Sequence, residues 1–325
     1  MSMLSDLWIG VIAGTLTLFV LSSLLRLVTR PLLPALTRLS ANARRMIAAA
    51  LLALPALTAI ALAVVMAASN HHLPFDLIAH HCHADAVGCA AHGRVSDYLP
   101  LTAIGAGLLT VFVSWFLFGA LEKLHAIRSS MRGLKPAISG RLTTAHILDV
   151  EAPLAFCAGL FSPKVYLSRG LTEQLTPDEI DMVRLHEASH VKSMDLMVRF
   201  IASLLSFGQF SSVRNNLMDM LVCAQEEVCD QKVARRFGRV ETAETLIKVQ
   251  RLRHSAAMLS PHCVAAIDHG DISARTLALL SPENAASGTS RLCIIASGLL
   301  LALAMLIASE PLHHYFETLI LSLKG

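Results

Sequence analysis

The chain has 325 residues, of which 54% are hydrophobic and 16% are charged, and its mean hydropathy is +0.58. Soluble globular proteins carry about 25% charged residues, so this composition excludes an ordinary soluble protein and indicates one that is embedded in a lipid bilayer. The formal net charge is only +3, and the basic residues form no aromatic-interleaved stripe of the kind that nucleic-acid-binding proteins present. We therefore expect no direct contact with nucleic acid.

Four apolar segments approach the roughly 20 residues that a helix needs to cross the hydrocarbon core of a membrane. In chain order they are Leu7–Leu25, Met46–Ala68, Leu99–Leu121 and Leu292–Ala308. The first lacks the basic start and the small-residue cleavage site of a signal peptide, so we expect it to be retained. We predict three transmembrane helices within residues 1–121, and a fourth helix with a short outer tail within residues 291–325.

Basic residues mark the loops that face the cytoplasm. Five arginines and no acidic residue lie between the first two apolar segments, and five basic residues follow the third, whereas the 69–98 loop has one arginine against three aspartates. This asymmetry predicts a multi-pass protein of the inner (cytoplasmic) membrane with both termini outside. Residues 122–290, the part with globular composition, are then expected to form a cytoplasmic domain.

The expected domain begins with strand-forming residues and continues into a helix. Residues around 153–169 are rich in strand and turn formers and predict two short strands. A helix is then predicted to begin at Pro177, with Thr176 as its N-cap and Glu179 closing a capping box.

That helix carries the sequence "RLHEASHVKS", residues 184–193, in which two histidines stand four residues apart. Side chains at this spacing lie on one helix face, so His186 and His190 are placed to bind a single Zn²⁺. Glu187 lies on the adjoining face, where it is suited to take a proton from water as a general base. The same spacing also arises by chance in helices that bind no metal, so its surroundings decide between the two interpretations.

A catalytic zinc site needs a third protein ligand, and a second helix supplies a candidate. We predict this helix over about Asn216–Phe237, with Gly238 as its C-terminal stop. Glu226 and Asp230 are four residues apart on it and share a face. Glu226 is the preferred third ligand, and Asp230 is placed to hold a ligand imidazole. The nearby Cys229 stays open as a ligand at this point.

Two stretches together resemble a known peptidase family. The sequences "AFCAGLFSPKVYLSRGLTEQLTPDEIDMVRLHEASHVKSMDLMVRF" and "QEEVCDQKVA" resemble the integral-membrane gluzincin peptidases of the beta-lactam sensor-transducer (antirepressor) family, and more distantly the membrane heat-shock zinc proteases and the CAAX prenyl proteases. The resemblance covers about residues 150–237. It implies a mainly α-helical membrane protein with a cytoplasmic α+β zinc peptidase domain inserted between the third and fourth spans.

The resemblance also assigns roles to individual residues. It implies one catalytic zinc held by His186, His190 and Glu226, with Glu187 as base and Asp230 supporting the ligands, and it gives Asp195 a structural role. It further implies an edge strand on which an extended substrate peptide lies, formed by Ala155, Phe156, Cys157, Ala158, Gly159 and Leu160.

A group that stabilises the negative charge of the transition state is also expected. The segment at 269–284 resembles one that brings an arginine to the site in related proteases, which makes Arg275 a candidate and His269 a weaker one. A charged residue on an exposed helix face is an equally good interpretation of either.

Sensor-transducers of this family often continue into a large extracellular ligand-binding domain, whereas about 17 residues follow Ala308 here, and we expect no such domain. The outer loop is a candidate replacement, because its histidines and cysteines suit Zn or Cu. These residues, with Asp85 beside them, are His71, His72, His80, His81, Cys82, His83, Cys89 and His92. A disulfide between Cys82 and Cys89, or a plain solvated loop, stays open as the alternative.

The leading functional prediction is a membrane zinc endopeptidase that transmits a signal by cleaving a cytosolic protein, such as a transcriptional repressor, or itself. Constitutive quality control of membrane proteins is the alternative within the enzyme class. A non-catalytic metal-binding receptor is the alternative outside it, although Glu187 argues against a purely structural metal site. A homodimer stays open.

Overall fold

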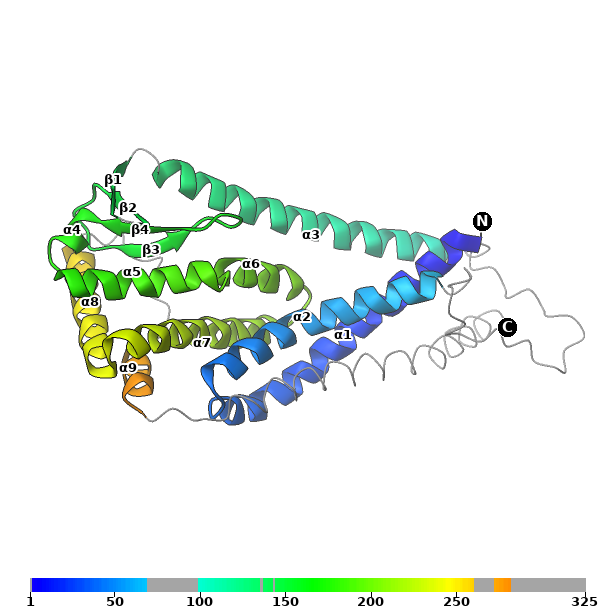
Figure 1. Cartoon of the computed structure of the whole chain (residues 1–325). Coiled ribbons are helices and arrows are strands. Elements are labelled where there is room, and N and C mark those ends of the chain that lie inside the picture. The colour runs from blue at the N-terminus through cyan, green and yellow to red at the C-terminus, as the bar shows by residue number, and fades with distance from the viewer. Residues whose placement is uncertain (1, 69–98, 135–136, 143, 260–271, 282–325) are drawn as a thin grey trace, which may run out of the picture.

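The computed structural model describes residues 2–68, 99–134, 137–142, 144–259 and 272–281 as a mainly helical protein with one small sheet (Figure 1). Its helices are α1 Ser2–Leu36, α2 Ala41–Ala68, α3 Leu99–Leu134, α4 Arg169–Thr172, α5 Pro177–Lys192, α6 Asp195–Leu205, α7 Ser211–Phe237, α8 Arg239–Leu259 and α9 Ile272–Leu280. Its strands are β1 Ile138–Leu142, β2 Ala145–Leu148, β3 Ala155–Ala158 and β4 Lys164–Ser168. The predicted fourth span, the 69–98 loop with its metal or disulfide alternatives, and His269 lie outside the described residues.

The three predicted spans within residues 1–121 are confirmed as helices long and apolar enough to cross a membrane. The apolar windows are Gly10–Thr29, Ala41–Val64 and Ala103–Leu134. The helices run further than the apolar runs predicted, since α1 continues to Leu36 and α3 to Leu134. Large apolar side chains on these helices are exposed, including Phe19, Trp115 and Phe118. Such faces are suited to contact lipid.

Glycines let α1 and α2 approach closely. A Cβ atom at Gly10 would lie 2.6 Å from the carbonyl oxygen of Ala63, and one at Gly14 would lie 2.8 Å from that of Ala59. Small residues at the crossing of two membrane helices permit this backbone proximity. Helices α1 and α2 therefore form a packed pair, from which α3 diverges toward the sheet (Figure 1).

The sheet has the strand order β1-β2-β4-β3, in which β2 and β4 are parallel and the other neighbours are antiparallel. The two strands predicted around 153–169 are confirmed as β3 and β4, and β3 lies at an edge of the sheet. The predicted substrate strand was too long by two residues. Gly159 and Leu160 belong to the turn after β3, because Gly159 adopts a positive φ of 110° that ends the extended backbone.

Helix α5 lies beneath the sheet, with α7 on its other side (Figure 1). The predicted capping box is confirmed, since Thr176 and Glu179 each bond the backbone N–H of the other and Pro177 occupies the first turn. A first core joins the sheet to α5 and α8 and contains Leu167, Leu171 and Val249.

A second core joins the membrane helices to α6 and α7. It packs Ala48 and Leu52 of α2 against Leu217 and Leu221 of α7, and each of these four residues is fully buried. The membrane pair α1 and α2 therefore supports the helix that carries Glu226.

Candidate metal centre and peptidase site

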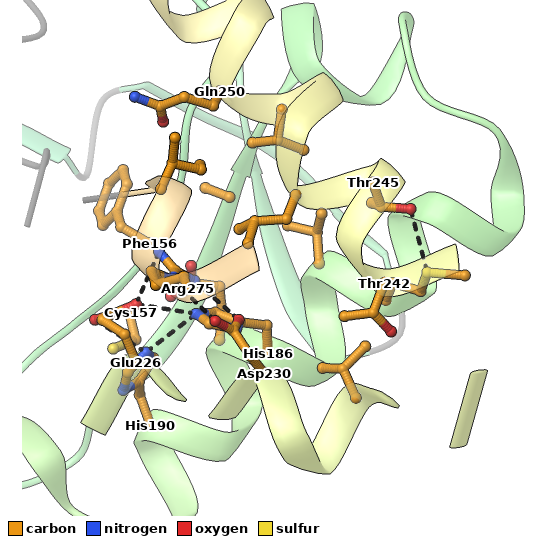
Figure 2. A pocket seen from close by; sticks show the side chains of 18 of the residues that line it. Phe156, Cys157, His186, His190, Glu226, Asp230, Thr242, Thr245, Gln250 and Arg275 are labelled. Carbon is orange, nitrogen blue, oxygen red and sulfur yellow. Dashed lines mark hydrogen bonds and ion pairs between the residues drawn. The ribbon is translucent and has the colours of Figure 1, made fainter. Parts of the chain in front are cut away.

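The two histidines and Glu226 converge on one point between α5 and α7 (Figure 2). The Nε2 atoms of His186 and His190 are 3.2 Å apart. The Glu226 carboxylate lies 3.3 Å from Nε2 of His186 and 3.5 Å from Nε2 of His190. One ligand atom from each of the three residues lies within 4.8 Å of the others. The structure thus brings the three predicted metal ligands together.

The other nitrogen of each ring is held by a carboxylate. His186 Nδ1 donates to Asp230 Oδ1 at 3.0 Å, and His190 Nδ1 donates to Asp195 Oδ2 at 2.8 Å. Because an ionised carboxylate only accepts hydrogen bonds, each Nδ1 carries a proton and each Nε2 is left to face Glu226. This carboxylate–histidine arrangement is the one that orients imidazoles toward a metal ion. Two imidazole nitrogens and a carboxylate oxygen are also a donor set that suits Zn²⁺.

Arginines hold the carboxylates in turn. Arg275 donates two hydrogen bonds to Asp230, each 2.8 Å long, and Arg199 Nη2 donates to Glu226 Oε1 at 3.1 Å. Since a planar guanidinium matches a carboxylate in a bidentate pair, Asp230 has little freedom to turn away from His186.

The pKa values show which charge this cluster favours. Burial alone lowers the pKa of His186, but its hydrogen bonds to Asp230 and Glu226 outweigh burial and raise this pKa to about 10. Burial likewise opposes charge on His190, yet its bonds to Asp195 and Glu226 raise the His190 pKa well above the usual range. Burial raises the pKa of Glu226, but the two histidines hold it well below its ordinary value. The site therefore stabilises positive charge between the three side chains, as a cation site must.

Glu187 adjoins the ligand cluster on α5 and lines the same cavity. Its side chain is 9% exposed and makes no hydrogen bond to any other side chain in the described ranges. A buried carboxylate without such a partner is available to a water molecule or a substrate.

The cavity, of about 330 Å³, extends from the ligand cluster between β3, α5, α6, α7, α8 and α9. Beyond the polar cluster its wall is largely apolar, with Met182, Val233 and Val249 among its members. Phe156 and Cys157 of β3 also line it (Figure 2). Burial and the nearby Glu187 carboxylate raise the pKa of the Cys157 thiol to about 12, so this thiol stays protonated.

Other predicted residues take more specific positions than their sequence pattern indicated. Arg275 is brought to the site, where its side chain is 14% exposed rather than on an open helix face. It binds Asp230, with its Nη1 3.5 Å from Glu226 Oε2. Asp195, expected to be structural, bonds a ligand imidazole directly. Two further residues at the site were not predicted: Arg199, and Arg253, which donates to the carbonyl oxygen of Ala155 at 2.8 Å. Neither stands in a recognisable motif.

A protein-family model and two known proteins match parts of this chain. Residues 120–279 match the family model described as BlaR1 peptidase M56. Protease HtpX homolog 2 of Methanosarcina mazei is 34% identical over 130 residues, which are 39% of this chain and 41% of that protein. The methicillin resistance mecR1 protein of Staphylococcus aureus is 27% identical over 139 residues, which are 41% of this chain and 22% of that protein.

The chain therefore matches less than half the length of these relatives, and no solved structure matches it. The family match covers the helices and strands that build the ligand cluster. Residues 120–279, the part of the chain that carries the ligand cluster, therefore match the BlaR1 peptidase M56 family.

Proposed function

We propose that the protein is a membrane-embedded zinc endopeptidase. The observation that carries the proposal is the convergence of His186, His190 and Glu226, with both Nδ1 atoms held by carboxylates. Relatives named as proteases support a peptidase activity. The free carboxylate of Glu187 beside the ligands argues for catalysis rather than for a metal-binding receptor.

Zn²⁺ held by His186, His190 and Glu226 would supply Lewis acidity at this point of the cavity. Glu187 is placed to take a proton from the attacking water and to return it to the leaving amine. Asp230 and Asp195 keep the imidazoles turned toward the site, and Arg275 fixes Asp230. Arg275 also adds positive charge near the carbonyl that is attacked, which favours the developing oxyanion.

The edge strand β3 supplies a backbone for an extended peptide. The N–H of Ser168 donates to the carbonyl of Leu154, so residue 154 faces β4. Since backbone groups alternate along an antiparallel strand, those of Ala155 and Cys157 face the open edge. Arg253 already binds the carbonyl of Ala155, which leaves Cys157 as the residue with both groups open to a substrate strand. A peptide paired there would run past Glu187.

We further propose that the site faces the cytoplasm and that it cuts a cytosolic repressor, or the protein itself, in response to an envelope signal. Support comes from the basic residues that flank the apolar segments and from similarity to a protein named for methicillin resistance. Quality control of membrane proteins is the second candidate, and similarity to relatives named as HtpX proteases supports the peptidase activity that both candidates share. Metal binding by the 69–98 loop remains a proposal for the signal that the protein senses.

Replacing Glu187 with Gln tests the activity. The change keeps the shape of the side chain and removes the base, so zinc content should stay near that of wild type while cleavage of an unfolded, labelled protein falls by about 10²–10⁴-fold. Glu244→Gln on the exposed face of α8 is the matched control and should change neither. Wild-type protein that binds no zinc, or a Glu187→Gln variant that cleaves normally, would refute the assignment.

A further inference from the structure

Membrane helix α2 carries two adjacent arginines near its N-terminus that reach α6 and α7. Arg44 pairs with Glu227 of α7, and Arg45 Nη1 lies 3.5 Å from Oδ1 of Asp195 in α6. The two acidic residues, Glu227 and Asp195, differ in their contacts with the histidines. Among the described residues Glu227 contacts neither histidine, whereas Asp195 bonds Nδ1 of His190. Arg45 is therefore linked through Asp195 to the predicted metal ligand His190, whereas the partner of Arg44 contacts neither histidine.

Burial of the Asp195 carboxylate costs free energy that its neighbours must offset. Asp195 is 2% exposed, and its Oδ1 has no hydrogen bond within the described part of the chain. A buried carboxylate is strongly destabilising unless a cation or hydrogen bonds compensate for its lost hydration. His190 must be neutral to bind a metal ion, so it then gives Asp195 a hydrogen bond but no charge. In the described ion pairs of Asp195, the remaining cation is Arg45.

The backbone conformation before Asp195 makes the direction of its carboxylate depend on contacts such as the one with Arg45. Asp195 is the first residue of α6 and follows Met194, which takes a left-handed conformation with φ of 53° at the break between α5 and α6. The carboxylate thus stands at a bend of the chain, and its direction depends on the groups it binds. One of these groups belongs to a membrane helix.

We propose that Arg45 is a positioning residue for the metal centre: it holds Asp195, and through Asp195 the imidazole of His190, in the orientation that binds zinc. The inference rests on the proposed function, since it requires that His186, His190 and Glu226 bind the metal. Its consequence is that the affinity of the site depends on where the start of α2 lies. A displacement of this membrane helix would change zinc binding directly.

The test measures zinc affinity rather than cleavage. Full-length wild type, Arg45→Ala, Arg45→Lys and Arg44→Ala are prepared in lipid nanodiscs, and the zinc dissociation constant of each is measured by competition with a chelator. Loss of a group that supports a metal ligand costs about 10–100-fold in affinity. Arg45→Ala should reach the lower end of this range, because Arg45 acts through Asp195, and Arg45→Lys should restore most of the loss. Arg44→Ala removes the neighbouring ion pair and should stay within about twofold of wild type.

A double-mutant cycle separates positioning from docking of α2. In an Asp195→Ala background, Arg45→Ala should have no further effect on zinc affinity. Equal losses from Arg45→Ala and Arg44→Ala, or the same loss with and without Asp195, would overturn the proposal and make Arg45 a docking residue. If Arg45→Ala does not fold, Arg45→Gln replaces it under the same criteria. Failure of the wild type to bind zinc would instead overturn the proposed function.

Discussion

The choice between two adjacent glutamates is the sharpest prediction of the structure. Glu226 faces both histidines, whereas Glu227, about 100° further around the helix, pairs with Arg44 of α2. Both side chains are mostly buried and both are ion-paired, so they are well matched except for the metal site. Glu226→Ala should therefore remove zinc binding, and Glu227→Ala should not.

The size of the effect follows from sharing the free energy of zinc binding among its ligands. Apparent values for structural zinc are about 10–16 kcal/mol, so loss of one of three or four ligands costs roughly 3–4 kcal/mol. This corresponds to an affinity lower by about 10²–10³-fold. Glu226→Ala also leaves Arg199 without a carboxylate partner and removes the ion pair between Arg275 and Glu226, so the free energy of unfolding should fall. Glu227→Ala leaves Arg44 unpaired in the same way and so matches this cost.

The assay combines chelator competition for zinc affinity with thermal unfolding of the metal-free proteins. Similar unfolding temperatures for the two variants, with zinc affinity lost only in Glu226→Ala, are expected. Glu226→Gln, which keeps the volume of the side chain, should lose affinity with less effect on stability. Equal zinc affinities for Glu226→Ala and Glu227→Ala would show that the ligand set is wrong.

Two further predictions concern protons and topology. The pKa of His186 is about 10 without metal, so zinc binding at pH 7 should release about one to two protons from the histidines. Calorimetry in buffers of different ionisation heat measures this release. A zinc affinity that does not rise between pH 7 and pH 10 would contradict the prediction. By the same linkage, the metal-free protein should keep this stabilisation below about pH 6.5 and lose it as the pH rises to 10. Cys157 is a poor reporter of topology because of its raised pKa, but Phe161 is 79% exposed after β3. In a variant without Cys82 and Cys89, Phe161→Cys should resist an impermeant thiol label on intact cells and react in inverted vesicles.

Local patterns carried most of what the sequence predicted correctly. The capping box at Thr176, the helix end at Gly238 and the spacing of His186 and His190 are each decided within a few residues of chain, so propensity and helical period suffice to find them. The apolar spans are equally local. Their ends were less accurate, because α3 continues as a polar helix beyond the hydrophobic run that defined it.

Contacts between segments far apart in the chain could not be predicted from the sequence. Strand β2 pairs in parallel with β4, although β3 comes between them in the sequence, and nothing in the short segment Ala145–Leu148 specifies that partner. Arg45 meets Asp195 across 150 positions of chain for a similar reason, since packing of α2 on α7 decides the approach. A single sequence marks such residues as charged without showing what they face.

The shared core leads to a last prediction, on whether the peptidase segment can fold alone. Leu217 and Leu221 of α7 are fully buried in a cluster that includes Leu52 of α2. Full burial of a leucine side chain is worth about 1.5–3 kcal/mol, so exposing even part of these two removes a large share of the roughly 5–15 kcal/mol that stabilises a domain. Removing α2 also leaves Glu227 and Asp195 without their arginines. A protein truncated to residues 120–281 should therefore aggregate, or bind a hydrophobic dye and unfold without a cooperative transition, when compared with the full chain in nanodiscs. If that segment is monomeric, unfolds cooperatively and binds zinc as tightly as the full chain, then the contacts of α2 are dispensable to the site and this reasoning is wrong.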